Sequence, residues 1–264
     1  MDPDPDEDYW REQIFERMNR AGLVLARIES NNPYPVEPDS DLAGDRAQVP
    51  DLWVDTLATR RLKVAVDYLA GVRDLLRAGT HFYAPFALLR AVLESSAAAV
   101  WLLEPDDRKI RLERVIGLHI DDCNNKKSLQ AMLPDNLRDS FDHEPGIRQM
   151  VSDSGSPRRK CKFPDYTSVM KAIDDFAGEG GSVYLSWKVC SGFSHGATWA
   201  TVGLIPQANR LQVGPTLHRA EMSPSYQLVL AQVGTAMRTV ERAHALFQVR
   251  RTSRPHNIRC ELRP

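Results

Sequence analysis

Most apolar residues in this chain recur at intervals of three or four positions, the spacing of residues that share one face of an α-helix. This pattern predicts helices over about residues 9–28, 51–77, 82–103, 106–133, 165–176, 184–205 and 224–249. Between them, residues 134–164 are predicted to be irregular with at most one short helix, and residues 206–222 to form a loop in which Gly214-Pro215 can turn a small hairpin. Strands and helices do not alternate, and no segment repeats at a fixed period. We therefore predict an all-α fold, a single helical bundle of about six to eight helices with an N-terminal helical arm.

Prolines and glycines divide the chain into three predicted parts. Residues 1–50 are predicted to hold the first helix and a Pro-rich linker, because Pro33, Pro35, Pro38 and Pro50 each lack a backbone donor and fix φ. Residues 51–250 form the predicted bundle, and residues 251–264 are predicted to be a basic, disordered tail. Two segments of the bundle, 82–103 and 184–205, are apolar on nearly all faces, which is typical of central helices.

Charge is balanced overall but unevenly distributed. The chain has 264 residues, 34 basic and 35 acidic, and its composition is that of a globular protein rather than a disordered or fibrous one. The balance excludes a chain that binds nucleic acid through overall positive charge. Arg158, Arg159 and Lys160 nevertheless form a basic cluster, and seven arginines lie between residues 238 and 264. These clusters are either a solvated loop and tail or sites that attract phosphate.

Several classes of protein are excluded or disfavoured by missing signals. The N-terminus is acidic, unlike a secretory signal, and the most apolar segment, 81–103, contains Arg90 and Glu94, which make a membrane span costly. The four cysteines lack the spacing of a zinc site, and no phosphate-binding loop or dinucleotide motif is present. We therefore expect a cytoplasmic protein with reduced thiols, no metal, no cofactor and no membrane partner.

The candidate site comes from the few polar residues on the two central helices. Arg90 and Glu94 are four residues apart and share a face. In the second helix one polar stripe runs along an otherwise apolar segment, at Tyr184, Lys188, Ser191, His195 and Thr198. Because buried charge must be paired, these stripes either satisfy one another as a buried network or line a functional site. A third alternative is that the helix breaks at Gly192 or Gly196 and the stripe does not form.

The combination of R-x-x-x-E at Arg90 and Glu94 with a later Ser-x-x-x-His-Gly stretch at Ser191, His195 and Gly196 resembles a class of bacterial all-helical proteins. That class is similar to the HEPN superfamily. The resemblance implies a compact, often dimeric helical bundle, and in many members a metal-independent ribonuclease of a defence or toxin-like system. It also implies an active site made of Arg, four to six further residues, and His.

Two pairs in this chain approach that motif. Arg114 and His119 match it literally, but five residues on a continuous helix turn their side chains about 140° apart. Lys188 and His195, seven residues apart, lie within about 20° of one face. The second pair departs from the family in having Lys in place of Arg, and Lys lacks the planar fork that binds phosphate in a bidentate manner.

These observations lead to three hypotheses. In the first, the protein acts on RNA: His195 is the general base, Lys188 or Arg90 holds the phosphate and Glu94 orients them. Substrate-binding residues would then include Tyr184, Ser191, Arg158, Arg159 and Lys160, and the protein would be a homodimer. In the second, the protein is a non-catalytic scaffold or sensor in which the Arg/Glu/Lys/His stripe is a buried structural network. In the third, the same stripe binds a small molecule or nucleotide.

Overall fold

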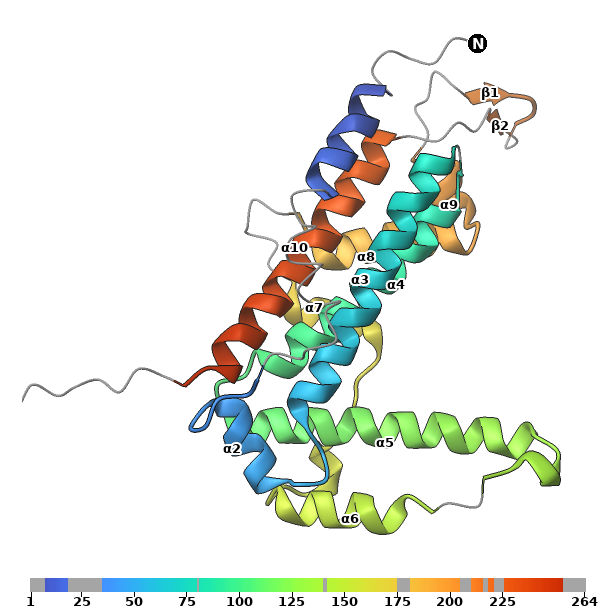
Figure 1. Cartoon of the computed structure of the whole chain (residues 1–264). Helices are drawn as coiled ribbons and strands as arrows, with labels where there is room; N and C mark the ends of the chain where they lie inside the picture. Colours follow the sequence, from blue (N-terminus) through green and yellow to red (C-terminus); the bar gives the residue numbers. More distant parts are fainter. Residues whose placement is uncertain are drawn as a thin grey trace, which may run out of the picture. The chain divides into compact units, whose positions relative to one another are not determined.

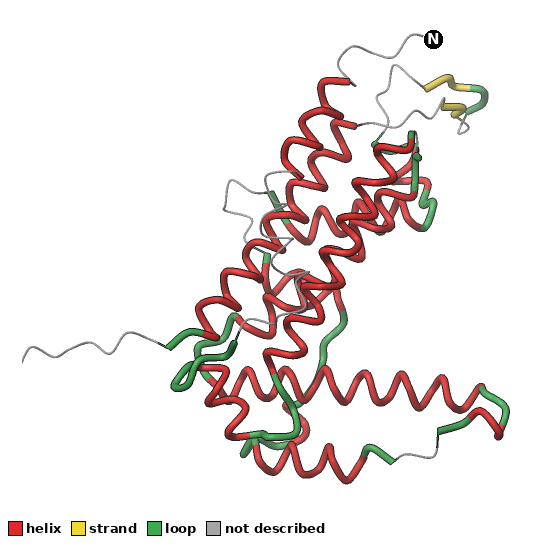
Figure 2. Tube along the Cα trace, viewed as in Figure 1, coloured by secondary structure: helices red, strands yellow, loops and turns green. Residues whose placement is uncertain are grey.

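The structure is a computed structural model that describes residues 8–18, 35–79, 81–139, 142–174, 181–204, 210–215, 218–220 and 226–253. Residues 8–18 are helical. The later helices are α2 (Asp41–Gln48), α3 (Val54–Ala78), α4 (Ala84–Leu103), α5 (Arg108–Met132), α6 (Glu144–Asp153), α7 (Tyr166–Ile173), α8 (Val183–Ser194), α9 (Thr198–Thr201) and α10 (Tyr226–Arg251). Two 3-10 turns, η1 (Asp135–Leu137) and η2 (Arg158–Lys160), flank α6. The predicted all-α fold is confirmed (Figures 1 and 2).

Short polar side chains determine where several of these helices begin. Asp107 accepts a hydrogen bond from the backbone N–H of Lys109 at the start of α5, and Asp165 accepts one from Ser168 at the start of α7. Such N-caps satisfy donors that have no partner within the helix. At the other end of α3, Gly79 adopts a φ of 136°, a conformation that favours glycine. The helix therefore ends where the sequence predicted it would.

Two predicted segments are corrected by the structure. The Pro-rich linker contains α2, because Pro33, Pro35 and Pro38 lie before Asp41 and Pro50 lies after Gln48, so the segment between them is free of proline. Ser40 caps the helix by accepting a hydrogen bond from the N–H of Ala43. The predicted helix over 184–205 is shorter, since α8 ends at Ser194 and α9 follows separately. The parts of the first and last predicted helices at residues 19–28 and 224–225 lie outside the described residues, as does the tail from residue 254.

The small hairpin predicted at Gly214-Pro215 is also present. Strand β1 (Arg210–Gln212) pairs antiparallel with β2 (His218–Ala220), with Leu211 opposite Arg219. The pairing is short and leaves the helical class of the fold unchanged.

Helix α4 is the central helix that its sequence predicts. It is long and apolar enough to cross a membrane, but 72% of its most apolar 18-residue window is buried inside the structure. Every residue from 95 to 100 is buried, including Ser96, whose hydroxyl donates to the carbonyl of Val92 within the same helix. A helix covered by protein on most sides is a core helix.

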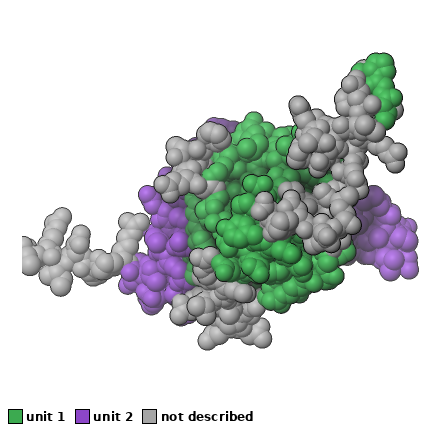
Figure 3. All heavy atoms as spheres, turned by 90° about the horizontal axis from the view of Figure 1, so that it is seen from above, with its two compact units in different colours: residues 1–31, 59–101, 164–244 green, residues 32–58, 102–163, 245–264 purple. Residues whose placement is uncertain are grey.

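The chain groups into two compact units, coloured in Figure 3. Unit 1 consists of residues 1–31, 59–101 and 164–244, and unit 2 of residues 32–58, 102–163 and 245–264. Helices α3, α4 and α10 each contribute residues to both units. The division of the sequence at residues 50 and 250 stays a prediction.

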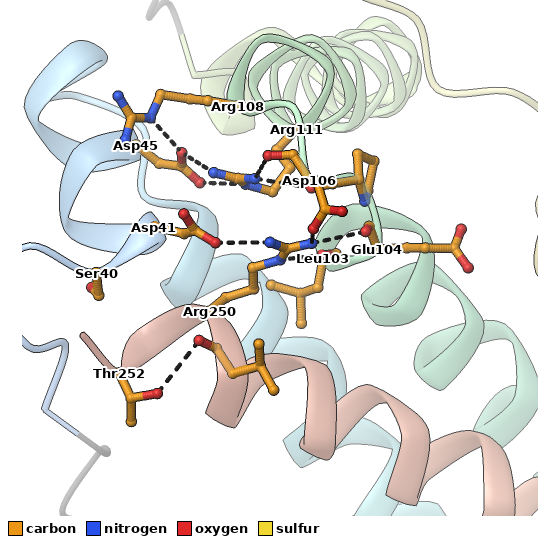
Figure 4. A network of polar contacts seen from close by, with 12 residues as sticks. Ser40, Asp41, Asp45, Leu103, Glu104, Asp106, Arg108, Arg111, Arg250 and Thr252 are labelled. Atoms are coloured by element: carbon orange, nitrogen blue, oxygen red, sulfur yellow. Dashed lines mark hydrogen bonds and ion pairs between the residues drawn. The ribbon is translucent and has the colours of Figure 1, made fainter. Parts of the chain in front are cut away.

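Unit 2 contains a network of buried ion pairs, shown in Figure 4. The fully buried Arg111 donates from Nε and Nη2 to the two oxygens of Asp45, which is also fully buried, at 2.9 and 2.7 Å. Its Nη1 donates to the carbonyls of Pro105 and Asp106 at 2.9 and 2.8 Å. Arg108, with a side chain 45% exposed, binds the same carboxylate from the solvent side at 3.2 Å.

Arg250 completes this network from α10. It is 3% exposed, and donates to the carbonyls of Leu103 and Glu104 at the end of α4 and to the carboxylates of Asp41 and Asp106. Burial alone would lower the pKa of Arg250, but its hydrogen bonds to the two carboxylates outweigh that effect and raise it. The arginine thus satisfies carbonyls that a helix end would otherwise leave unpaired.

We expect Arg111→Met to lower the free energy of unfolding by about 3–5 kcal/mol, because it leaves the buried carboxylate of Asp45 without its main partner. Arg108→Met, which removes the exposed partner of the same carboxylate, should cost less than about 1 kcal/mol. Urea denaturation followed by circular dichroism measures both. Equal losses in the two variants would contradict the burial argument.

A second pair of variants tests close packing in unit 2. A β-carbon at Gly117 in α5 would lie 2.5–2.8 Å from the backbone of Lys162, whereas one at Gly146 in α6 meets nothing within 4 Å. Gly117→Ala should therefore destabilise the protein by about 1–3 kcal/mol. Gly146→Ala should stabilise it by about 0.5–1 kcal/mol through helix propensity alone. Thermal unfolding of the two variants would refute this reading if the signs agreed.

Candidate functional site

The candidate site is built on α8, whose first turn is held by Asp174. Ser182 caps the helix by accepting a hydrogen bond from the N–H of Leu185 at 3.0 Å. Its hydroxyl donates to Asp174 Oδ2, and the N–H of Val183 donates to Asp174 Oδ1, each at 2.7 Å. Because Asp174 directly follows α7, these bonds fix the start of α8 relative to α7.

The other end of α8 places His195 at the surface. His195 is the C-cap, Gly196 turns the chain with a φ of 62°, and the N–H of Ala197 donates back to the carbonyl of Gly192 at 2.8 Å. This ending is the break at Gly196 that the sequence left open. Residues 184–194 remain on one helix with His195 at its cap, but Thr198 belongs to α9 and no longer continues the stripe.

Arg90 and His195 meet between α4 and the end of α8. Arg90 Nη1 lies 2.6 Å from His195 Nε2, and Arg90 Nε donates to Glu94 Oε1 at 2.9 Å. The indole N–H of Trp187 donates to the same carboxylate oxygen, also at 2.9 Å. The guanidinium of Arg90 also lies over the Trp187 ring, 5.9 Å from its centroid. Arg90 is thus held from two sides while one of its nitrogens faces His195.

The contact between Arg90 and His195 determines the tautomer of the histidine. A guanidinium has only N–H donors, so the partner nitrogen must accept. His195 Nε2 is therefore the acceptor in this contact and presents its lone pair to Arg90. A histidine nitrogen that accepts from a fixed cation has the arrangement of a general base next to an anion-binding group.

These groups are accessible to solvent rather than sealed in the core. The side chains of Arg90 and Glu94 are 28% and 21% exposed, and both Lys188 and His195 are exposed. The ion pair that the spacing of Arg90 and Glu94 predicted is present. Lys188 Nζ lies 5.9 Å from the centroid of the Trp187 ring.

The other two predicted residues of α8 have more local roles. The half-buried Tyr184 stacks against Trp187 at a centroid distance of 6.2 Å and lies under Lys171 Nζ at 5.2 Å. The carbonyl of Ser191 accepts the N–H of His195 and the hydroxyl of Ser194, which closes the last turn of the helix.

The predicted basic loop belongs to unit 2, whereas Arg90, Glu94, Lys188 and His195 belong to unit 1. Its three residues form η2 and all are exposed. Arg158 binds Glu144 through two bonds, from Nη1 to Oε1 at 2.8 Å and from Nη2 to Oε2 at 3.1 Å. One of the three positive charges of this loop is therefore already paired with a carboxylate.

The literal motif at Arg114 and His119 lies on one continuous helix, α5. The two side chains therefore point about 140° apart, as the sequence geometry predicted. Burial lowers the pKa of Arg114 and also that of His119, with the charge of His143 lowering the latter further. His119 Nε2 lies 3.6 Å from Cys123 Sγ, four residues along the helix.

The described residues offer little support for metal binding or for catalysis by a cysteine. They contain no group of three or more His, Cys, Asp or Glu side chains that could hold a metal ion. Cys190 also lies on α8, but burial raises the pKa of its thiol far above neutrality, which suppresses the nucleophilic thiolate. Cys123, Cys161 and Cys190 are free thiols, as predicted, and Cys260 lies outside the described residues.

Trp187 is the site residue that sequence reasoning missed. It is 7% exposed, and on an apolar helix a tryptophan is typical of core packing. The available signal was its indole N–H, which needs a partner when buried. Glu94, on the other central helix, supplies that partner.

No protein-family model, curated protein or solved structure matches this chain. The site is therefore interpreted from its own geometry.

We expect Trp187→Phe to lower the free energy of unfolding by about 1–2 kcal/mol, because it removes a donor to a partly buried carboxylate. A double-mutant cycle with Glu94→Gln isolates this hydrogen bond from the loss of ring area. The cycle should give a coupling energy of about 1 kcal/mol in urea denaturation. A coupling energy near zero would show that the bond contributes nothing to joining α8 and α4.

Proposed function

We propose that this chain is a HEPN-like RNA-binding protein of a bacterial defence or toxin-like system and a metal-independent endoribonuclease that works in the cytoplasm. The observation that carries the proposal is the 2.6 Å contact between Arg90 Nη1 and His195 Nε2 at an exposed surface. It joins an accessible base to an accessible cation, the two groups that cleavage of a phosphodiester by its own 2′-hydroxyl requires.

The proposed reaction is an internal transfer of the phosphoryl group. His195 Nε2 takes the proton of the ribose 2′-hydroxyl, and the 2′-oxygen forms a bond to phosphorus. The bond from phosphorus to the 5′-oxygen of the next nucleotide breaks, and that oxygen takes a proton from solvent. The products are a 2′,3′-cyclic phosphate and a free 5′-hydroxyl, so no bond to the protein forms.

Arg90 serves this reaction by exchanging partners. In the free protein it donates to His195, while Glu94 and Trp187 hold the other side of the guanidinium. A bound phosphate competes for the donors that face His195, which releases the Nε2 lone pair for the 2′-hydroxyl. Lys188 is exposed on α8, the helix that ends at His195, and adds a second positive charge there. Its ammonium group lacks the planar fork of arginine.

A second candidate function has its own observation. Glu94 accepts both from Arg90 and from Trp187, and so joins α4 to α8 whether or not a substrate is present. This favours a non-catalytic scaffold or sensor in which the cluster maintains the fold. In that case replacing His195, an exposed group at the edge of the cluster, changes neither stability nor any activity on RNA.

The two functions are distinguished by incubating the purified full chain with 5′-labelled single-stranded RNA in the presence of EDTA. Wild type should cleave the RNA and leave cyclic phosphate ends, and His195→Ala should be slower by about 10²-fold or more, the usual contribution of a general base. His81→Ala, which replaces an exposed histidine of the same unit, should cleave like wild type.

Two results would decide against the nuclease. One is a wild-type protein that leaves the RNA intact, and the other is a His195→Ala variant that cleaves as fast as His81→Ala. Thermal melts of all three proteins show whether each is folded.

The homodimer that the resemblance implies is part of the same proposal, and light scattering of the wild type gives its molar mass.

A further inference from the structure

Trp199 is the most exposed tryptophan among the described residues, with 54% of its surface accessible. It lies in α9, directly after the turn that ends α8 (Figure 1). A solvated indole of this size is unusual for core packing and suits a surface that binds another aromatic or apolar group.

The ring of Trp199 is fixed in place by Gly192. A β-carbon at position 192 would lie 2.5 Å from Cζ2 and 2.7 Å from Cη2 of the indole, so the edge of the ring rests directly on the α8 backbone. The N–H of Ala197 donates to the carbonyl of Gly192, which holds the start of α9 against the same turn. This contact explains why position 192, inside α8, is a glycine.

This placement brings an aromatic face to the edge of the candidate site. Gly192 lies in the last turn of α8 and His195 is the C-cap that ends the same turn. Lys188 lies four residues before Gly192 and so shares its side of the helix. The indole resting on Gly192 therefore stands within about one helical turn of both a base and a cation.

We infer that Trp199 stacks on an unpaired base of the RNA and thereby selects single-stranded substrates; the inference rests on the proposed function of the same site. An exposed, fixed aromatic ring beside positive charge is the arrangement by which proteins bind single strands, because every base has a face that can stack. A paired base in a duplex is already stacked on both sides and offers no such face. The phosphate next to the stacked base then lies within reach of Arg90 and Lys188.

The test measures binding of a probe that cannot be cleaved. A fluorescent 2′-O-methyl oligoribonucleotide, single-stranded or paired with its complement, is titrated with the full chain and followed by anisotropy. Wild type should bind the single strand more tightly than the duplex. Trp199→Ala should weaken single-strand binding about tenfold or more and leave duplex binding unchanged, so that the preference disappears.

Three further variants make the result specific. Trp199→Phe keeps a face for stacking and should retain most of the affinity. Gly192→Ala, whose methyl group would clash with the indole and with Ala200 Cβ and so displace the start of α9, should weaken single-strand binding although Trp199 is intact. Leu185→Ala removes an apolar side chain 58% exposed near the start of α8 and should bind like wild type.

Failure of this inference and failure of the nuclease proposal have different signatures. If RNA is not cleaved but single-strand binding depends on Trp199, the nuclease fails and the stacking role stands. If cleavage depends on His195 but Trp199→Ala binds the single strand like wild type, the stacking role is overturned. It is also overturned if wild type does not prefer the single strand, or if Trp199→Ala changes the molar mass, which would assign the indole to an interface between copies.

Discussion

The carboxylate of Glu94 is the group on which the geometry of the candidate site depends. One of its oxygens accepts from Arg90 on its own helix and from the indole of Trp187 on α8. These bonds join two apolar helices that have few other polar groups, and so they determine which residues of α8 face α4. Because Arg90 is held in this way, its remaining donors point to the surface where His195 ends the helix.

The two units use arginine in different ways. In unit 2, Arg111 and Arg250 are almost completely buried, and their donors are occupied by carboxylates and backbone carbonyls. Removing Arg111 would leave the buried carboxylate of Asp45 uncompensated, which is the mark of a structural role. In unit 1, Arg90 keeps about a quarter of its side chain exposed and contacts a histidine whose lone pair can be released. Only the second arrangement leaves groups available to a ligand.

The sequence predicted the all-α class, the central position of α4, the pairing of Arg90 with Glu94 and the end of α3 near residue 77. Each depends on local spacing or on one residue's backbone preference, which a sequence carries directly. It left a break at Gly192 or Gly196 open as an alternative but could not decide for it, because the apolar pattern continues through residues 197–204 while Gly196 reverses the chain. It also treated Arg250 as part of a basic C-terminal cluster, since nothing local indicates that the carbonyls at the end of α4 lie beside it. Contacts between segments more than 140 residues apart cannot be read from spacing.

The position of Arg250 has a consequence for the order in which the chain acquires its structure. The carbonyls of Leu103 and Glu104 and the carboxylates of Asp41 and Asp106 are synthesised long before the arginine that binds them. A nascent chain that lacks residues 245–251 thus holds one helix end, with its two carbonyls, and two carboxylates that do not yet have this donor. Unit 2 is therefore completed only after synthesis has passed α10, and until then water must solvate the carbonyls and the Asp41 carboxylate that Arg250 binds in the finished protein.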